Sequence, residues 1–144
     1  MKETHISEVR AFNRWYTAII GVLNRKWMDG DLTLPETRVL QAISMQDGIT
    51  AGEIVPLLHI DKSYLSKIII RFEREKYLTK KVSAADARSY ELHLTAMGRR
   101  EFEKHNRMTN EFVRQMLEPL PAAECEELVG CMRRITEILG KVGA

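Results

Sequence analysis

The fold is decided by residues 50–94, TAGEIVPLLHIDKSYLSKIIIRFEREKYLTKKVSAADARSYELHL, in which helix-like spacing gives way to strand-like alternation. Apolar residues at the three-and-four spacing of an amphipathic helix lie in its middle part. They are Leu65, Ile68, Ile69 and Phe72. The spacing predicts a helix from Asp61 to Lys76, with this apolar stripe in the core and a polar, basic face turned outward.

A shorter helix is predicted before it. Thr50 is a suitable N-cap, and Glu53 stands three residues later, which is the pattern of a capping box. The side chains expected to face inward are Ile54, Leu57 and Leu58. Pro56 removes one helix hydrogen bond, so we expect this helix to be short or kinked.

Two short strands are predicted after the second helix. Apolar and polar residues alternate over residues 78–82 and again over residues 90–94, and an exposed loop at residues 83–89 joins them as a β-hairpin. Two short helices with a tight turn, followed by a hairpin, make a winged helix-turn-helix. In that arrangement the second helix of the pair enters the major groove of DNA.

The flanking segments are predicted to be helical, so the expected fold class is mainly α with a small hairpin. A first helix with Phe12 and Tyr16 on its apolar face ends near Asp29-Gly30-Asp31. The next begins at Leu34-Pro35-Glu36, a long helix follows Thr95, and a last helix follows a break at residues 119–121. We expect one chain unit over residues 1–144, with residues 34–96 as the winged helix and residues 1–30 and 97–144 as dimerisation helices.

Length and composition favour an ordinary soluble protein and exclude several classes. With 144 residues the chain fits one domain, and no apolar run is long enough to cross a bilayer, so we expect a cytoplasmic protein without a membrane partner. The four histidines show no ligand spacing, so no metal is predicted. No phosphate-binding loop or activated nucleophile is visible, which argues against an enzyme and against a cofactor. Cys125 and Cys131 are unsuited to a bridge within one chain, although a redox switch between subunits stays open.

The net charge of +2 is unevenly distributed. Between Lys62 and Arg88 the chain carries eight basic and three acidic residues, a net charge of +5, which leaves −3 for the rest. A local basic region on an acidic body is typical of a protein that binds a polyanion. A solvated basic face without any partner is the alternative that charge alone leaves open.

The predicted helix-turn-helix supplies the candidate DNA contacts. The residues expected to touch phosphates or base edges from its second helix are Lys62, Ser63, Tyr64, Ser66, Lys67, Arg71 and Arg74. Lys67 and Arg71 lie four residues apart and can both donate to guanine acceptors. Arg88 in the hairpin loop is expected to reach the minor groove, with Asp86 orienting its guanidinium. A surface turn with a weak ion pair is the alternative at this position.

The chain resembles the multiple-antibiotic-resistance regulator (MarR) family of winged-helix transcription factors from the first helix to the last. The resemblance is carried in order by residues 50–54 (TAGEI), 62–68 (KSYLSKI), 71–73 (RFE), 86–88 (DAR) and 94–98 (LTAMG). It implies a homodimer made by the terminal helices, two recognition helices on a pseudo-palindromic site in double-stranded DNA, and Arg88 as the wing contact. Three departures matter. Lys76 stands where the family often has glycine, Ile70 stands where it often has an acidic residue, and Pro56 disturbs the supporting helix.

The resemblance also implies a small aromatic ligand. The residues of the first helix that could line such a site are Phe12, Trp15, Tyr16 and Trp27, although core and dimer packing explains these side chains better. We therefore expect a dimeric repressor that a ligand releases from DNA. The alternatives are a winged-helix module that binds an acidic protein partner, and a cysteine-based redox-responsive regulator.

Overall fold

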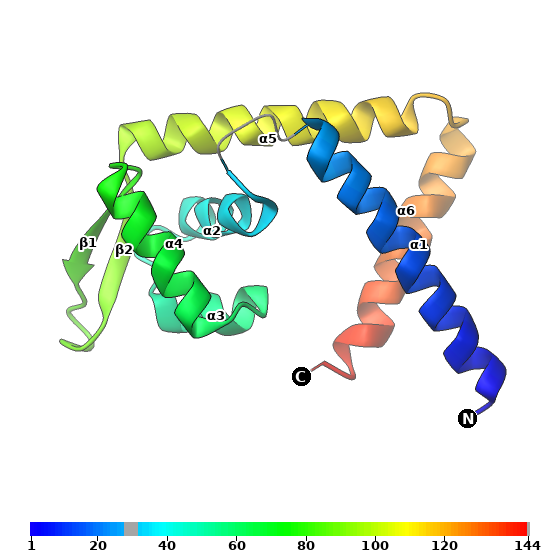
Figure 1. The fold of residues 1–144 in the computed structure, drawn as a ribbon, viewed down its shortest axis with the longest axis horizontal. Coiled ribbons are helices and arrows are strands. Elements are labelled where there is room, and N and C mark those ends of the chain that lie inside the picture. Colours follow the sequence, from blue (N-terminus) through cyan, green and yellow to red (C-terminus); the bar gives the residue numbers. More distant parts are fainter. Residues whose placement is uncertain (28–31, 144) are drawn as a thin grey trace. The chain divides into compact units, whose positions relative to one another are not determined.

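The computed structural model describes the backbone of residues 1–27 and 32–143, and side chains except those of residues 22–31 (Figure 1). The helices are α1 (Glu3–Trp27), α2 (Leu34–Met45), α3 (Ala51–Leu58), α4 (Lys62–Arg74), α5 (Ala96–Leu117) and α6 (Ala122–Gly140). The strands are β1 (Leu78–Val82) and β2 (Tyr90–Leu94). The predicted fold class is confirmed. The turn expected at Asp29-Gly30-Asp31 lies outside the described residues.

The described chain forms two compact units, Met1–Met108 and Thr109–Ala144. The core of the first unit lies between α2, α3, α4 and the hairpin. Its completely or almost completely buried side chains include Val39, Leu40, Ile43, Ile54, Leu65, Ile68, Phe72, Leu78 and Leu92. The predicted stripe of α4 is therefore the part of this helix that fills the core, which leaves its opposite face free for a partner.

The hairpin is antiparallel, with Leu78 opposite Leu94 and Val82 opposite Tyr90. The chain before α3 adds to its edge, because the amide of Leu92 donates to the carbonyl of Ile49 at 3.0 Å and that of Gly48 donates to the carbonyl of Leu92 at 3.0 Å. This short pairing was not predicted from the sequence. It ties the start of the helix-turn-helix to the hairpin.

Helix α3 differs from the expectation in two details. Leu57 was expected in the core but is 59% exposed, because the helix ends one residue later at Leu58 and only Ile54 is fully buried. Thr50 does cap the helix by accepting from the amide of Glu53 at 3.3 Å. The carboxylate of Glu53, however, accepts from Gln46 Nε2 at 3.0 Å, so the side chain that would complete the capping box has another partner. A full capping box forms instead at the start of α2, between Thr33 and Glu36.

Lys76 has a left-handed backbone, with φ of +64°, at the turn between α4 and β1. A side chain with a Cβ is strained there by about 1 kcal/mol. We expect Lys76→Gly to raise the free energy of unfolding by about 0.5–1 kcal/mol, less than the full strain because glycine also gains freedom in the unfolded chain. Urea denaturation measures it. Lys76→Ala is the control, since it removes the long side chain but keeps the strain; an equal gain in both variants would contradict the explanation.

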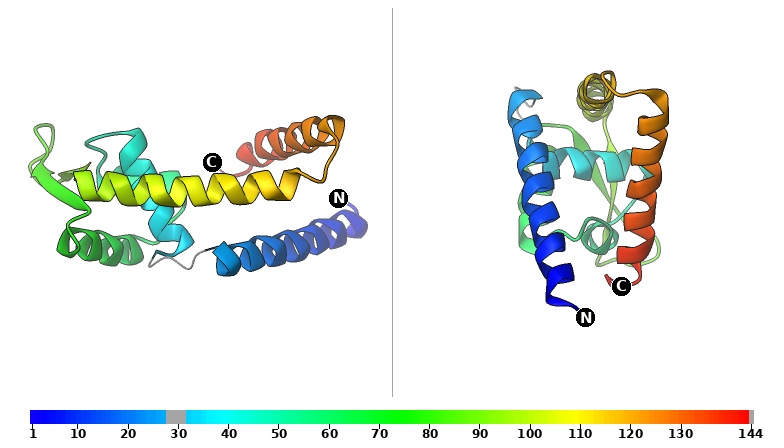
Figure 2. Two further views of the ribbon diagram at one scale, coloured as in Figure 1. Left: turned by 90° about the horizontal axis from the view of Figure 1, so that it is seen from above. Right: turned by 90° about the vertical axis from the view of Figure 1, so that its right-hand side faces the viewer.

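The second unit has large apolar side chains that are exposed to solvent. Figure 2 shows the loop that joins the end of α5 to α6. Large apolar side chains of the two helices remain exposed in this unit, among them Val113, Met116, Met132, Ile135 and Leu139. Cys125 and Cys131 have free thiols in the described chain; Cys125 is partly buried, and Cys131 is exposed. Within the described residues, no helix has the length and apolar character needed to span a membrane.

Candidate nucleic-acid interface

Helix α4 is fixed at its start by a side-chain cap. Asp61 accepts a hydrogen bond from the amide of Tyr64 at 2.9 Å, which satisfies one of the free amides at the helix start. Free amides at a helix start can bind phosphate, but the amide of Tyr64 is already used by Asp61 and is not available for this. The tight turn before α4 includes His59, whose backbone is left-handed with φ of +49°. The cap and the buried stripe together set the rotation of α4 about its axis.

Six of the seven sequence-predicted contacts on α4 are exposed, and they share the side of the helix that the core does not use. They are Lys62, Ser63, Tyr64, Ser66, Lys67 and Arg74. Two donors with long side chains, Lys67 and Arg74, lie about two turns apart on this side. This combination of short hydroxyls and long cations suits contacts to base edges and to phosphates.

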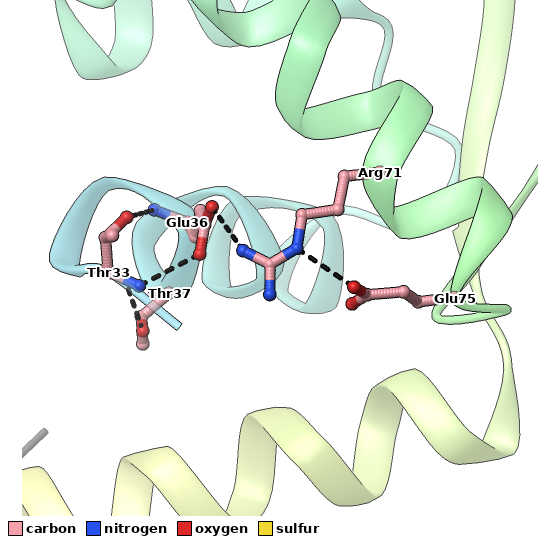
Figure 3. A network of polar contacts seen from close by, with 5 residues as sticks. All are labelled: Thr33, Glu36, Thr37, Arg71 and Glu75. Carbon is pink, nitrogen blue, oxygen red and sulfur yellow. Dashed lines mark hydrogen bonds and ion pairs between the residues drawn. The ribbon is translucent and has the colours of Figure 1, made fainter. Parts of the chain in front are cut away.

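Arg71, the seventh, is turned toward the protein (Figure 3). Its Nη1 lies 2.6 Å from Glu36 Oε1 on α2, and its Nε lies 3.0 Å from Glu75 Oε1 at the end of α4. The residue Glu36 is only 7% exposed, and its other carboxylate oxygen accepts the amide of Thr33 at 2.9 Å. One carboxylate therefore caps α2 and holds the arginine of α4.

The carboxylates of Glu36 and Glu75 both contact the guanidinium of Arg71 and favour its charged form. Its hydrogen bond to Glu75, followed by that to Glu36, raises the pKa of Arg71 above its usual value despite partial burial. These contacts engage at least two of the five N–H donors of the guanidinium and hold it toward α2 and the end of α4. The geometry thus favours a positioning role for Arg71 over the base contact expected from the sequence.

The hairpin loop is ordered by hydrogen bonds from its own side chains. Ser83 Oγ accepts from the amide of Ala85 at 3.2 Å, and Asp86 Oδ1 accepts from the amide of Arg88 at 2.9 Å. The structure thus shows Asp86 holding the backbone at Arg88, whereas the sequence suggested that it holds the guanidinium. Arg88 itself is exposed in this loop, as a contact to DNA requires.

The family model that matches this chain covers α2, α3, α4 and the hairpin loop. Residues 30–89 match the MarR family. The resemblance to the MarR family is confirmed. No curated protein matches the sequence significantly.

Solved MarR-family structures share the fold over most of the chain. A mutant MarR from E. coli is 20% identical, with a TM-score of 0.76 over 88% of this chain and 93% of its own. The PcaV transcriptional regulator from Streptomyces coelicolor, in complex with its natural ligand, is 22% identical, with a TM-score of 0.74 over 88% and 89%. FabT from Streptococcus pneumoniae, in complex with DNA, is 18% identical, with a TM-score of 0.78 over 93% and 99%. The chain therefore has the fold of MarR-family transcriptional regulators.

The residues predicted to bind an aromatic ligand all lie on α1. Phe12 and Tyr16 stack with ring centroids 5.5 Å apart, and Trp15 lies 6.3 Å from Phe12. All three are exposed, and the side chain of Trp27 lies outside the described residues. A hollow beside the start of α1 is lined by other residues, namely Glu3, Ile6, Ser7, Arg10 and Arg14. The described residues contain no cluster of side chains that could hold a metal ion.

The sequence interpretation missed two residues, a buried one behind the candidate interface and an exposed one on it. Glu36 was taken only as part of a helix start, because its partner lies 35 residues away in the sequence and no local pattern connects them. Ile70 was noted only as a departure from the family pattern. Its position opposite the buried stripe of α4 was visible in the helical spacing, and that spacing could have identified it as an outward-facing residue.

Proposed function

We propose that this chain is a dimeric transcriptional regulator, a repressor, that binds pseudo-palindromic double-stranded DNA through α4 in the major groove and the hairpin loop in the minor groove. One observation carries the proposal: the exposed side of α4 presents hydroxyls and cations, while its whole apolar stripe is used by the core. The basic region around α4 supplies the charge that DNA binding needs. The complex of FabT with DNA supports it by analogy of fold.

A homodimer is the second part of the proposal. Both terminal helices carry exposed apolar side chains, such as Val9 and Trp15 on α1 and Ile135 and Leu139 on α6. A run of this kind along a helix is costly in water and is covered when a second helical surface packs on it. A two-fold dimer would present two copies of α4 to successive half-sites, one turn of DNA apart.

Release by a small aromatic ligand is the third part. The complex of PcaV with its natural ligand supports ligand binding by analogy of fold, and the aromatic side chains of α1 favour an aromatic ligand. A ligand that binds more tightly to a dimer with wrongly spaced recognition helices shifts the population away from DNA. The effect is limited by the difference between its affinities for the two states.

Selection of bound duplexes from random DNA tests the proposal. We expect enrichment of an inverted repeat whose half-site centres lie about 10 base pairs apart. Repeating the selection with aromatic acids present is expected to reduce recovery of the same repeat. If no sequence is enriched, the proposed function is wrong, and binding of an acidic protein partner becomes the better explanation of the basic face.

The hairpin loop gives a separate prediction. Arg88→Ala is expected to weaken binding to all duplexes and to lower the slope of log affinity against log salt by about 0.9 for one lost phosphate contact. Binding titrations at several salt concentrations measure this. Lys104→Ala, a change of equal charge at an exposed position of α5, is the control and should leave the slope unchanged. An unchanged slope for Arg88→Ala would remove the loop from the interface.

A further inference from the structure

Ile70 lies in the middle of the outward side of α4. The exposed residues Ser63, Lys67, Ile70 and Arg74 follow one another at spacings of four, three and four, which places them in one row along the helix. The side chain of Ile70 is 59% exposed. Since the buried stripe on the opposite side already anchors α4, the core does not explain an isoleucine at this position.

The neighbours of Ile70 in the row indicate what it would meet on DNA. Lys67 and Arg74 lie about one turn to either side, and both have long side chains that reach phosphates while their stems lie along the groove. Ile70 is short and has no hydrogen-bond donor, so it gains nothing from a phosphate. Inside a major groove it would lie against the base edges, where the C5-methyl group of thymine is the apolar feature.

We propose that Ile70 contacts a thymine C5-methyl group and so selects thymine at one position in each half-site. This inference rests on the proposed function and adds a specificity-determining residue to it. Single exposed apolar residues are common on protein surfaces. Leu57 on α3 is one of equal exposure, at 59%, but it does not lie in a row of cations on the helix proposed to enter the groove. The placement of Ile70, and not its exposure alone, carries the inference.

Deoxyuridine substitution tests the contact, because uracil lacks only the C5-methyl group of thymine. In the duplex obtained by selection, each thymine of one half-site is replaced in turn. For the wild-type protein we expect about fourfold weaker binding at one position, the loss equivalent to one buried methyl group, about 0.8 kcal/mol. Ile70→Ser should bind the thymine and uracil duplexes equally at that position, and Leu57→Ser should respond as the wild type does.

Three results would overturn the inference. The wild type and Ile70→Ser could lose the same affinity with each uracil, no single uracil could matter, or Leu57→Ser could lose the response as Ile70→Ser does. These failures leave the proposed function intact, since the protein would still prefer its selected duplex. If the protein prefers no duplex at all, the proposed function and the role of Ile70 both fail. Helix content measured by circular dichroism should be equal for the two serine variants, because both replace exposed residues.

Discussion

Gly98→Ala is expected to lower the free energy of unfolding by about 3 kcal/mol or more, and to disturb the start of α5 where it contacts the turn between α4 and β1. A Cβ at residue 98 would lie 1.9 Å from the carbonyl oxygen of Tyr77 and 2.8 Å from its carbonyl carbon. These are backbone atoms, and the same oxygen accepts the amide of Thr95 at 3.0 Å. Neither side can move without breaking hydrogen bonds between the α4–β1 turn and the cap of α5.

Gly52→Ala is the matched control for this substitution. Gly52 is also near the start of a helix in the first unit, but a Cβ there would have the hydroxyl of Thr50 as its nearest neighbour, at an ordinary 3.9 Å. Alanine should therefore be neutral or stabilise α3 by up to about 1 kcal/mol. Urea denaturation of both variants makes the comparison. Equal stability of the two would show that the approach of α5 to Tyr77 is not as close as described.

Arg71→Ala is expected to cost about 2 kcal/mol of stability, because it leaves the buried carboxylate of Glu36 without its charged partner. The cap bond from the amide of Thr33 would remain, so α2 should still begin at the same place. The double variant Arg71→Ala/Glu36→Gln should be more stable than Arg71→Ala alone, since a neutral amide tolerates burial better than an unpaired charge. Chemical denaturation of the wild type, Arg71→Ala, Glu36→Gln and the double variant completes a double-mutant cycle.

Arg74→Ala is the control for Arg71, one turn further along the same helix. Arg74 is exposed, so its removal should change the unfolding free energy by less than about 0.5 kcal/mol while lowering the salt dependence of DNA binding. Two outcomes would contradict the positioning role of Arg71. One is equal stability of Arg71→Ala and the wild type; the other is loss of preference at a single base pair, which is the sign of a direct base contact.

The elements of the fold were predictable because local patterns determine them. The three-and-four stripe of α4, the alternation in the hairpin, and Pro35 in the first turn of α2 all act within a few residues of sequence. The inward-facing residues of α4 followed from the same spacing. Lys76 stands where the family often has glycine, and its φ of +64° is the left-handed conformation that glycine favours.

The parts that could not be predicted depend on contacts between distant residues. Arg71 looks like a base contact from its own helix, because nothing near it in the sequence reveals that Glu36 lies 2.6 Å away. Glu53 had the right spacing for a capping box, but Gln46 offers its carboxylate another partner. Leu57 follows the apolar spacing of α3 yet remains exposed, since the short helix turns only Ile54 fully into the core.

The proposed DNA-binding surface reads sequence through the outward side of α4, and the loop at Arg88 adds affinity for any duplex. The most direct test of this claim is the affinity of the wild-type protein for the selected duplex and for a scrambled duplex of the same length and composition, both at physiological salt. We expect the selected duplex to bind at least about 10³-fold more tightly, the usual margin of specific over non-specific binding. Equal affinity for the two duplexes, or no binding to either, would contradict the claim.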